Sequence, residues 1–110
     1  MEQPIDKELN VSIKGTKVGK ALIRTYSDGL IFLSNFVIDD KYRGKGLGQQ
    51  ALKILMTKYG VNGLTAAVDN KAAKHIYDKF GFIVRGEPYY DENSGEIVYY
   101  MTTKDAPSDE

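Results

Sequence analysis

The chain has 110 residues, of which 42% are hydrophobic, and this is enough for one domain with a buried core. Lys and Arg number 15 and Asp and Glu number 15, so the neutral net charge argues against binding of nucleic acid through a broad basic surface. The sequence has no Cys and one His, which excludes disulfides, thiolate metal sites and a cysteine nucleophile.

The first part of the sequence predicts three antiparallel strands. Residues 9–13 alternate apolar and polar side chains, residues 14–19 form a turn, and residues 21–26 form the second strand. The pair Asp28-Gly29 favours a tight hairpin turn. Residues 30–38 are mostly apolar, as expected of a strand that is buried on both faces.

The apolar period then changes to that of a helix. From Leu47 onward it predicts a helix whose C-terminal cap is Gly60. A short strand over residues 64–68 follows, and Asp69 or Asn70 is the N-cap of a second helix that ends at Gly81. The apolar face of the first helix comprises Leu47, Ala51, Ile54, Leu55 and Tyr59, and that of the second comprises Ala73, Ile76, Tyr77 and Phe80.

The last part of the chain predicts two more strands, over residues 82–84 and 97–103, with a polar loop between them. The order of elements is β-β-β-α-β-α-β-β, which is a mixed α/β sheet in a single domain over residues 1–104. The acidic segment of residues 105–110 is expected to be a disordered tail.

A glycine-rich turn connects the third strand to the first helix. Its sequence is Arg43-Gly44-Lys45-Gly46-Leu47-Gly48. Glycines let the backbone come close to a ligand, and the start of the helix adds unpaired N–H groups and the positive end of its dipole. With the charges of Arg43 and Lys45 beside it, the turn predicts a site for a phosphate or diphosphate.

The glycine spacing excludes two common phosphate-binding motifs. A dinucleotide fingerprint needs G-x-G-x-x-G, whereas this turn reads G-x-G-x-G and continues with Gln49. A P-loop needs G-x-x-x-x-G-K-[ST], which the turn does not supply. The alternative that stays open is a flexible connection with incidental charge.

A second block of spaced residues lies on the second predicted helix. It reads Asn70-x-x-Ala73-x-x-x-Tyr77-x-x-x-Gly81-Phe82, and it follows the turn Arg43-x-x-Gly46-x-Gly48 in the sequence. In this order the two blocks resemble the acetyl-CoA motif and the later helix of the GNAT superfamily of N-acetyltransferases. The segment from Gly86-Glu87 through residues 98–101 resembles the last hairpin of that family.

The resemblance implies the GNAT-like acyl-CoA N-acyltransferase fold and acetyl-CoA as the co-substrate. Backbone N–H groups of the turn would bind the diphosphate, and the edge of the third strand would pair with the pantetheine arm. A backbone N–H near Ile38 would polarise the thioester carbonyl, and Asn70 would contact the arm. The residues expected to bind the cofactor are Phe36, Val37, Ile38, Arg43, Gly44, Lys45, Gly46, Leu47, Gly48 and Asn70.

Tyr77 is the residue to which the resemblance gives a catalytic role. Its hydroxyl would lie near the sulfur and protonate the departing thiolate, because a phenol with a pKa of ~10 carries its proton at neutral pH. The alternative is a tyrosine that packs in the core. A neutral amine attacks a thioester directly, so this mechanism needs no cysteine.

The sequence does not identify a general base. No Asp or Glu lies within residues 30–38, Asp39 and Asp40 are interpreted as structural, and His75 is interpreted as a surface residue. An α-amino acceptor, with a pKa of ~8, needs only water to lose its proton, whereas a lysine acceptor needs more help.

The acceptor side is expected to be open. Family members begin with a strand and one or two helices that shape the acceptor pocket, and this sequence has only about eight residues before its first predicted strand. The acceptor would be a protein or peptide amine in an open groove or a small molecule, or a second subunit of a homodimer would complete the wall. Tyr89, Tyr90 and Tyr99 either line this side or pack at the edge of the sheet.

The leading hypothesis is an enzyme that moves the acetyl group of acetyl-CoA to a primary amine. The alternative is an acyl-CoA-binding regulatory module without transferase activity. A third hypothesis, a nucleic-acid-binding domain that uses Lys41, Arg43 and Lys45, is disfavoured by the neutral charge. No apolar run approaches ~18 residues, and the N-terminus lacks the apolar stretch of a signal peptide. We therefore expect a cytoplasmic protein with no membrane partner and no metal.

Overall fold

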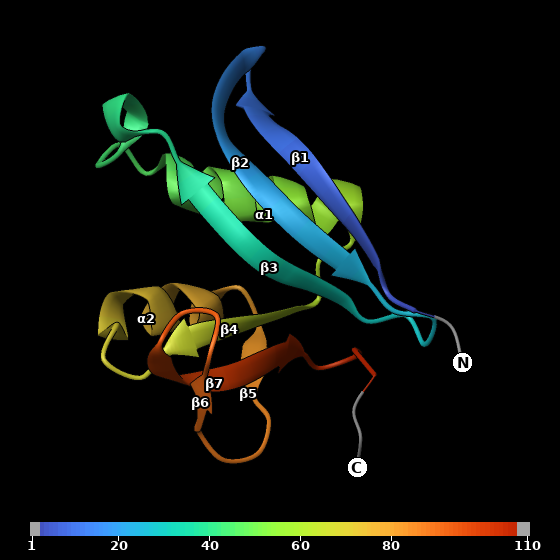
Figure 1. Cartoon of the computed structure of the whole chain (residues 1–110). Coiled ribbons are helices and arrows are strands. Elements are labelled where there is room, and N and C mark those ends of the chain that lie inside the picture. The colour runs from blue at the N-terminus through green and yellow to red at the C-terminus, as the bar shows by residue number, and fades with distance from the viewer. Residues whose placement is uncertain (1–2, 108–110) are drawn as a thin grey trace. The chain divides into compact units, whose positions relative to one another are not determined.

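The computed structural model describes residues 3–107 of the chain (Figure 1). The chain divides into two compact units between Val61 and Asn62, and each unit is described by itself. The first unit is an antiparallel sheet with one long helix, and the second is a smaller antiparallel sheet with a shorter helix.

The sheet of the first unit consists of three antiparallel strands, β1 (Ile5–Ile13), β2 (Thr16–Thr25) and β3 (Ile31–Ile38). The Asp28-Gly29 turn joins β2 to β3, and the Asp28 carboxylate accepts a hydrogen bond from the Leu30 N–H at 3.0 Å. A bulge on β3 shifts the register, because Leu22 pairs with Asn35 whereas Ile23 pairs with Leu33. Ser34 is therefore the extra residue on β3.

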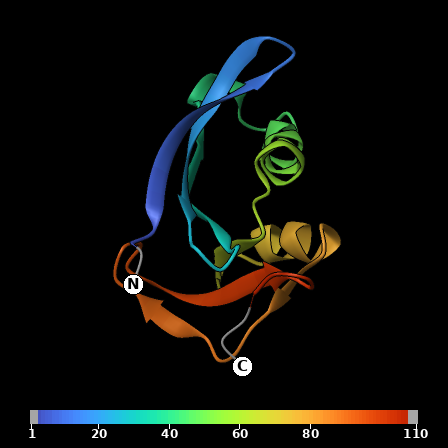
Figure 2. The same cartoon turned by 90° about the vertical axis from the view of Figure 1, so that its right-hand side faces the viewer.

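The core of the first unit lies between one face of this sheet and α1 (Leu47–Tyr59). Figure 2 shows α1 along one side of the three strands. The helix ends at Gly60, whose left-handed conformation (φ 76°) is the expected cap, with its N–H bonded to the last carbonyls. The buried side chains of this core are Leu9, Val11, Ala21, Ile23 and Leu33 from the strands and Ala51, Leu52 and Leu55 from the helix.

The second unit is built around its last strand, β7 (Glu96–Thr103). Strand β4 (Gly63–Ala67) pairs with β7, as do the short strands β5 (Phe82–Val84) and β6 (Tyr89–Asp91), all in antiparallel orientation. Helix α2 (Lys71–Lys79) packs against β4 and β5.

The predicted order of elements and the mixed α/β fold class are confirmed, and several boundaries differ. Strand β1 begins at Ile5, earlier than predicted, and β6 lies in the segment predicted to be a loop. The prediction that the third strand is buried on both faces is wrong, because Ser34, Asn35 and Val37 of β3 are exposed. Leu52 is a buried residue of α1 that the helical spacing did not include.

The predictions of one domain over residues 1–104 and of a disordered tail over residues 105–110 stay predictions. Residues 108–110 lie outside the described residues. Within the described part of the tail, Ala106 is buried and its N–H donates to the Thr103 carbonyl at 3.2 Å.

The backbone of β2 lies very close to that of β3 at Gly19. A Cβ atom at Gly19 would lie 2.2 Å from the Val37 carbonyl oxygen and 3.1 Å from the Ile38 Cα, and both are backbone atoms that cannot swing aside. Gly19 is therefore required by close packing of two backbones, and its φ is not in the left-handed region.

We expect Gly19→Ala to lower the free energy of unfolding by at least about 1–3 kcal/mol, because overpacking forces the strands apart. Gly48→Ala is the matched control, since a Cβ there meets no atom within 4 Å and its backbone is helical. Chemical denaturation of both variants measures the difference. Equal stability of Gly19→Ala and the parent protein would show that β2 and β3 do not pack this closely.

Candidate functional site

The chain leaves the end of β3 through a one-turn 3-10 helix, η1 (Asp40–Tyr42), and then enters the glycine-rich turn. Gly44 (φ 77°) and Gly46 (φ 74°) both have left-handed backbone conformations, which residues with a Cβ rarely adopt. Gly46 is also the N-cap of α1. These two glycines let the backbone turn sharply from the strand into the helix.

The N-terminus of α1 has no cap from a side chain. Gly46 supplies none, and the first turn of the helix has no acidic residue. The positive end of the helix dipole is thus not offset by a carboxylate in the first turn, which favours binding of an anion. Apart from the adjoining residues and the helix's own backbone, no protein atom lies within 4 Å of the Cβ position of Gly44, Gly46 or Gly48, so the space beside the turn is open.

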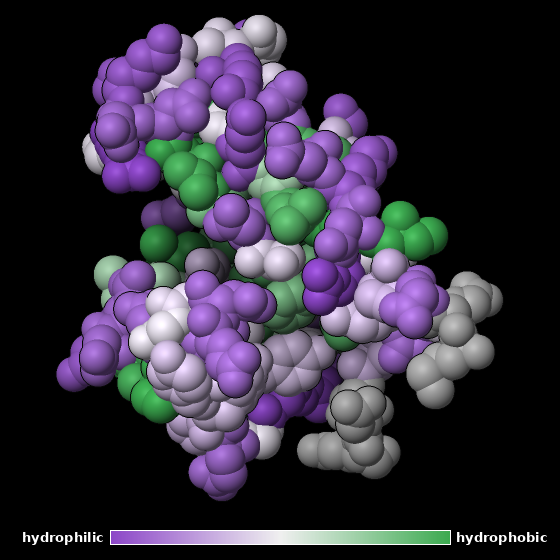
Figure 3. All heavy atoms as spheres, viewed as in Figure 1, coloured by the Kyte–Doolittle hydropathy of each residue, from purple (hydrophilic) through white to green (hydrophobic). Residues whose placement is uncertain are grey.

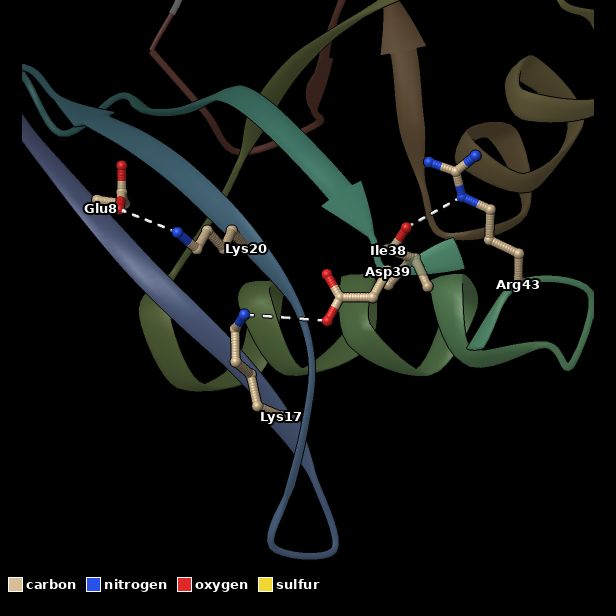
Figure 4. A network of polar contacts seen from close by, with 6 residues as sticks. All are labelled: Glu8, Lys17, Lys20, Ile38, Asp39 and Arg43. Atoms are coloured by element: carbon tan, nitrogen blue, oxygen red, sulfur yellow. Dashed lines mark hydrogen bonds and ion pairs between the residues drawn. The ribbon is translucent and has the colours of Figure 1, made fainter. Parts of the chain in front are cut away.

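Arg43 holds the turn to the end of β3. Its Nε donates a hydrogen bond to the Ile38 carbonyl at 3.0 Å (Figure 4). Its guanidinium also forms an ion pair with Asp40 at 3.1 Å. The side chain therefore positions the turn, while the Lys41 ammonium lies over the Tyr42 ring, 5.2 Å from its centroid. Two of the three cations proposed for nucleic-acid binding thus have partners within this segment.

A pocket of about 400 Å³ lies between the end of β3 and the start of α1. This volume is within the range of ~300–1,000 Å³ that is usual for small-molecule sites. Every residue of the first unit that was predicted to bind the cofactor lines the pocket, with the exception of Lys45. The lining residues are Phe36, Val37, Ile38, Tyr42, Arg43, Gly44, Gly46, Leu47 and Gly48.

Sequence reasoning missed Tyr42 in this lining. The residue stands directly before the motif, in η1, and its half-buried ring is part of the pocket. An aromatic residue immediately before a glycine-rich turn was the available signal, because the short 3-10 helix brings its side chain back beside the turn.

Asn70 and Tyr77 lie on α2, in the second unit. The Asn70 side-chain oxygen accepts a hydrogen bond from the Ala73 N–H at 3.0 Å, so Asn70 is the N-cap of the helix. The side-chain amide N–H groups are the donors that Asn70 can offer to a ligand. His75, on the same helix, is exposed as expected.

Tyr77 is packed against the Phe82 ring in an edge-to-face arrangement, with centroids 6.2 Å apart. Burial raises the pKa of the Tyr77 hydroxyl above its usual value, because the ionised form is less well solvated. The phenol is therefore protonated throughout the neutral range. Burial also raises the pKa of Tyr89, with a smaller contribution from the nearby Asp91 carboxylate.

Within residues 3–107 no helix is long and apolar enough to cross a membrane. The same residues contain no group of three or more His, Cys, Asp and Glu side chains that is placed to hold a metal ion.

Comparison with known proteins gives one family. Residues 4–82 match the model of the acetyltransferase (GNAT) family. Over 94 residues the chain is 30% identical to a spermine/spermidine N(1)-acetyltransferase of Bacillus subtilis (strain 168), and the match covers 74% of the chain and 62% of the relative. The chain thus spans less than two thirds of the length of this relative.

Solved structures with the same fold include two acetyltransferases. The ribosomal-protein-S18-alanine N-acetyltransferase from Escherichia coli has a TM-score of 0.67 at 24% identity, over 100% of this chain and 74% of that one. A GNAT family acetyltransferase from Elizabethkingia anophelis with acetyl-CoA bound has a TM-score of 0.61 at 16% identity, over 84% of this chain and 71% of that one. With the family model matching residues 4–82, the chain belongs to the GNAT acetyltransferase family.

Proposed function

We propose that the protein is an acetyl-CoA-dependent N-acetyltransferase that acetylates a primary amine by direct attack. The observation that carries the proposal is the pocket between β3 and α1, with its left-handed glycines and an uncapped helix N-terminus. Because the chain belongs to the GNAT family, we propose that the anion bound here is the diphosphate of acetyl-CoA, which needs N–H donors of this kind.

The proposed donor site uses backbone groups. N–H groups from Arg43 to Gly48 hold the diphosphate, and the backbone of residues 36–38 pairs with the pantetheine arm as a short extra strand. In this site a backbone N–H near Ile38 polarises the thioester carbonyl. The geometry of the pocket supports this arrangement, because Phe36, Val37 and Ile38 line it together with the glycines.

Tyr77 is proposed as the general acid. A phenol whose pKa is raised by burial keeps its proton at the pH where an amine is partly neutral, and it can give that proton to the leaving sulfur. Asn70 is proposed to donate its side-chain N–H to the pantetheine arm while its oxygen caps α2. A cytoplasmic location and a homodimer are further proposals that rest on the sequence.

The acceptor is proposed to be a primary amine, and its class is open to direct measurement. A relative at 30% identity carries the name of a spermine/spermidine acetyltransferase, and a structural neighbour acetylates an alanine of a ribosomal protein. Incubation with acetyl-CoA and a panel of alkylamines, polyamines and peptides, followed by measurement of free CoA, tests the activity. Binding of acetyl-CoA without turnover on any amine would support the regulatory module instead.

We expect Gly48→Glu to weaken binding of coenzyme A at least about 10-fold without loss of stability. Position 48 is in the first turn of α1, where a Glu is favourable by about 0.3–1 kcal/mol, and a Cβ there meets no protein atom. The carboxylate, however, would repel the diphosphate. Calorimetric titration with coenzyme A measures the affinity.

Gly48→Gln is the matched control, because it has the same size without the charge. It should weaken binding less than Gly48→Glu, and the difference should shrink at high salt because screening reduces the repulsion. Equal affinities of both variants and the parent protein would place the diphosphate elsewhere.

We expect Tyr77→Phe to lower kcat by about 100-fold or more and to leave the Kd for acetyl-CoA unchanged, as for loss of a general acid. Because the pKa of Tyr77 is raised, the alkaline fall in kcat should lie above pH ~10 in the parent protein and be absent from the variant. Tyr59→Phe on α1 is the control. Unchanged kcat in Tyr77→Phe would remove Tyr77 from this role.

A further inference from the structure

The two units of the chain carry opposite formal charges. Residues 1–61 hold ten Lys and Arg against six Asp and Glu, for a charge of +4, and residues 62–110 hold five against nine, for a charge of −4. The zero net charge of the whole chain therefore conceals a cationic first unit. The pocket between β3 and α1 belongs to this cationic unit.

Most carboxylates of the first unit are already used in ion pairs. Within residues 3–61 the pairs are Asp6–Arg24, Glu8–Lys20, Asp39–Lys17 and Asp40–Arg43. The one other carboxylate there, Asp28, accepts a hydrogen bond from the backbone of its own turn. The lysines of this unit that have no carboxylate partner among the described residues are Lys7, Lys14, Lys41, Lys45, Lys53 and Lys58.

The face of the sheet opposite to α1, here called the open face, has charges that nearly cancel. It holds a second pocket of about 270 Å³, lined by residues of all three strands, and Val37 lines both this pocket and the first one. Figure 3 is viewed from this face, on which hydrophobic atoms lie among hydrophilic side chains. In and beside the pocket, Lys20 Nζ lies 4.0 Å from Glu8 Oε1, and Lys17 Nζ lies 3.9 Å from Asp39 Oδ2 (Figure 4). The open face therefore does not supply the positive charge of the unit.

The excess positive charge is concentrated in the segment that forms the proposed donor pocket. Residues 41–61 contain no Asp or Glu. Lys41 and Lys45 lie in and beside the glycine-rich turn, Lys53 and Lys58 lie on α1, and all four are exposed. Lys41 and Lys58 lie over the rings of the tyrosines that follow them, which leaves their charge in place. These four residues are called the donor-side lysines below.

We propose that the donor-side lysines draw the anionic donor toward the pocket between β3 and α1, and that they favour intact coenzyme A over less charged thioesters. The inference rests on the proposed acetyltransferase function. Coenzyme A carries a diphosphate and a phosphomonoester, which together hold about four negative charges at neutral pH. A surface of one sign around a site raises the association rate of an oppositely charged ligand by about 10- to 1,000-fold.

The position of Lys53 separates this effect from direct contact. Lys53 is exposed, it does not line the pocket, and it lies two turns along α1, about 9 Å from Leu47 along the helix axis. Charges interact through solvent over about 30 Å at 0.01 M ionic strength, but only over about 8 Å at 0.15 M. Lys53 should therefore act on the rate of association, and its effect should fade as salt is added.

We expect Lys53→Gln to lower the association rate constant of acetyl-CoA about 2- to 5-fold at about 0.01 M ionic strength, and to leave the dissociation rate constant unchanged. The difference from the parent protein should vanish at about 1 M salt. For dephospho-coenzyme A, which lacks the phosphomonoester, the association rate should fall about half as steeply with salt. Stopped-flow measurement of tyrosine fluorescence follows binding, because Tyr42 lines the pocket.

Lys7→Gln is the matched control, because it removes an exposed lysine of the same unit that also has no described carboxylate partner. Lys7 pairs with Ile23, which pairs with Leu33 near the start of β3, whereas the donor pocket lies at the end of β3. The association rate should change less in Lys7→Gln than in Lys53→Gln.

Binding is measured without an acceptor, so the outcome does not depend on turnover. Equal association rates in Lys53→Gln and the parent protein at low salt would overturn the inference, as would a change confined to the dissociation rate. Binding of acetyl-CoA that does not depend on salt would contradict this inference alone. Absence of any binding would contradict the proposed function together with it.

Discussion

The end of β3 is held in place by contacts of its backbone, and both pockets depend on it. Because Gly19 has no side chain, the backbone of β2 can approach the backbone of β3 at Val37 and Ile38. The Val18 carbonyl accepts a hydrogen bond from the Asp39 N–H at 2.8 Å, and the Ile38 carbonyl accepts one from Arg43 Nε at 3.0 Å. These contacts fix where the strand stops and where the glycine-rich turn starts, so the placement of the anion site follows from them.

Local sequence signals were sufficient to predict the glycine-rich turn and the ends of the helices. A left-handed glycine and a capping Asn depend on a few neighbouring residues, which is why Gly60, Asn70 and the Asp28-Gly29 turn were predictable. The donor side of the candidate site was predictable for the same reason, because a strand, a turn and a helix N-terminus follow one another directly in the chain.

Features that depend on pairing between distant segments were not predictable from local pattern. The start of β1 is a strand although Ile5 is 70% exposed, because it pairs with β2 and Asp6 pairs with Arg24. The pocket on the open face needs the register of three strands and the bulge at residue 34. A periodicity argument fixes neither the register nor the bulge.

The alternation of side chains along β3 gives the first unit two different chemical surfaces. On the side of α1, an uncapped helix N-terminus and open glycines favour an anion. On the opposite side, Glu8 and Asp39 face ammonium groups. The net charge of that face is small, because its carboxylates are paired with lysines of the same face. A strand of period two thus presents different side chains to its two faces, and only the face toward α1 has the features of an anion site.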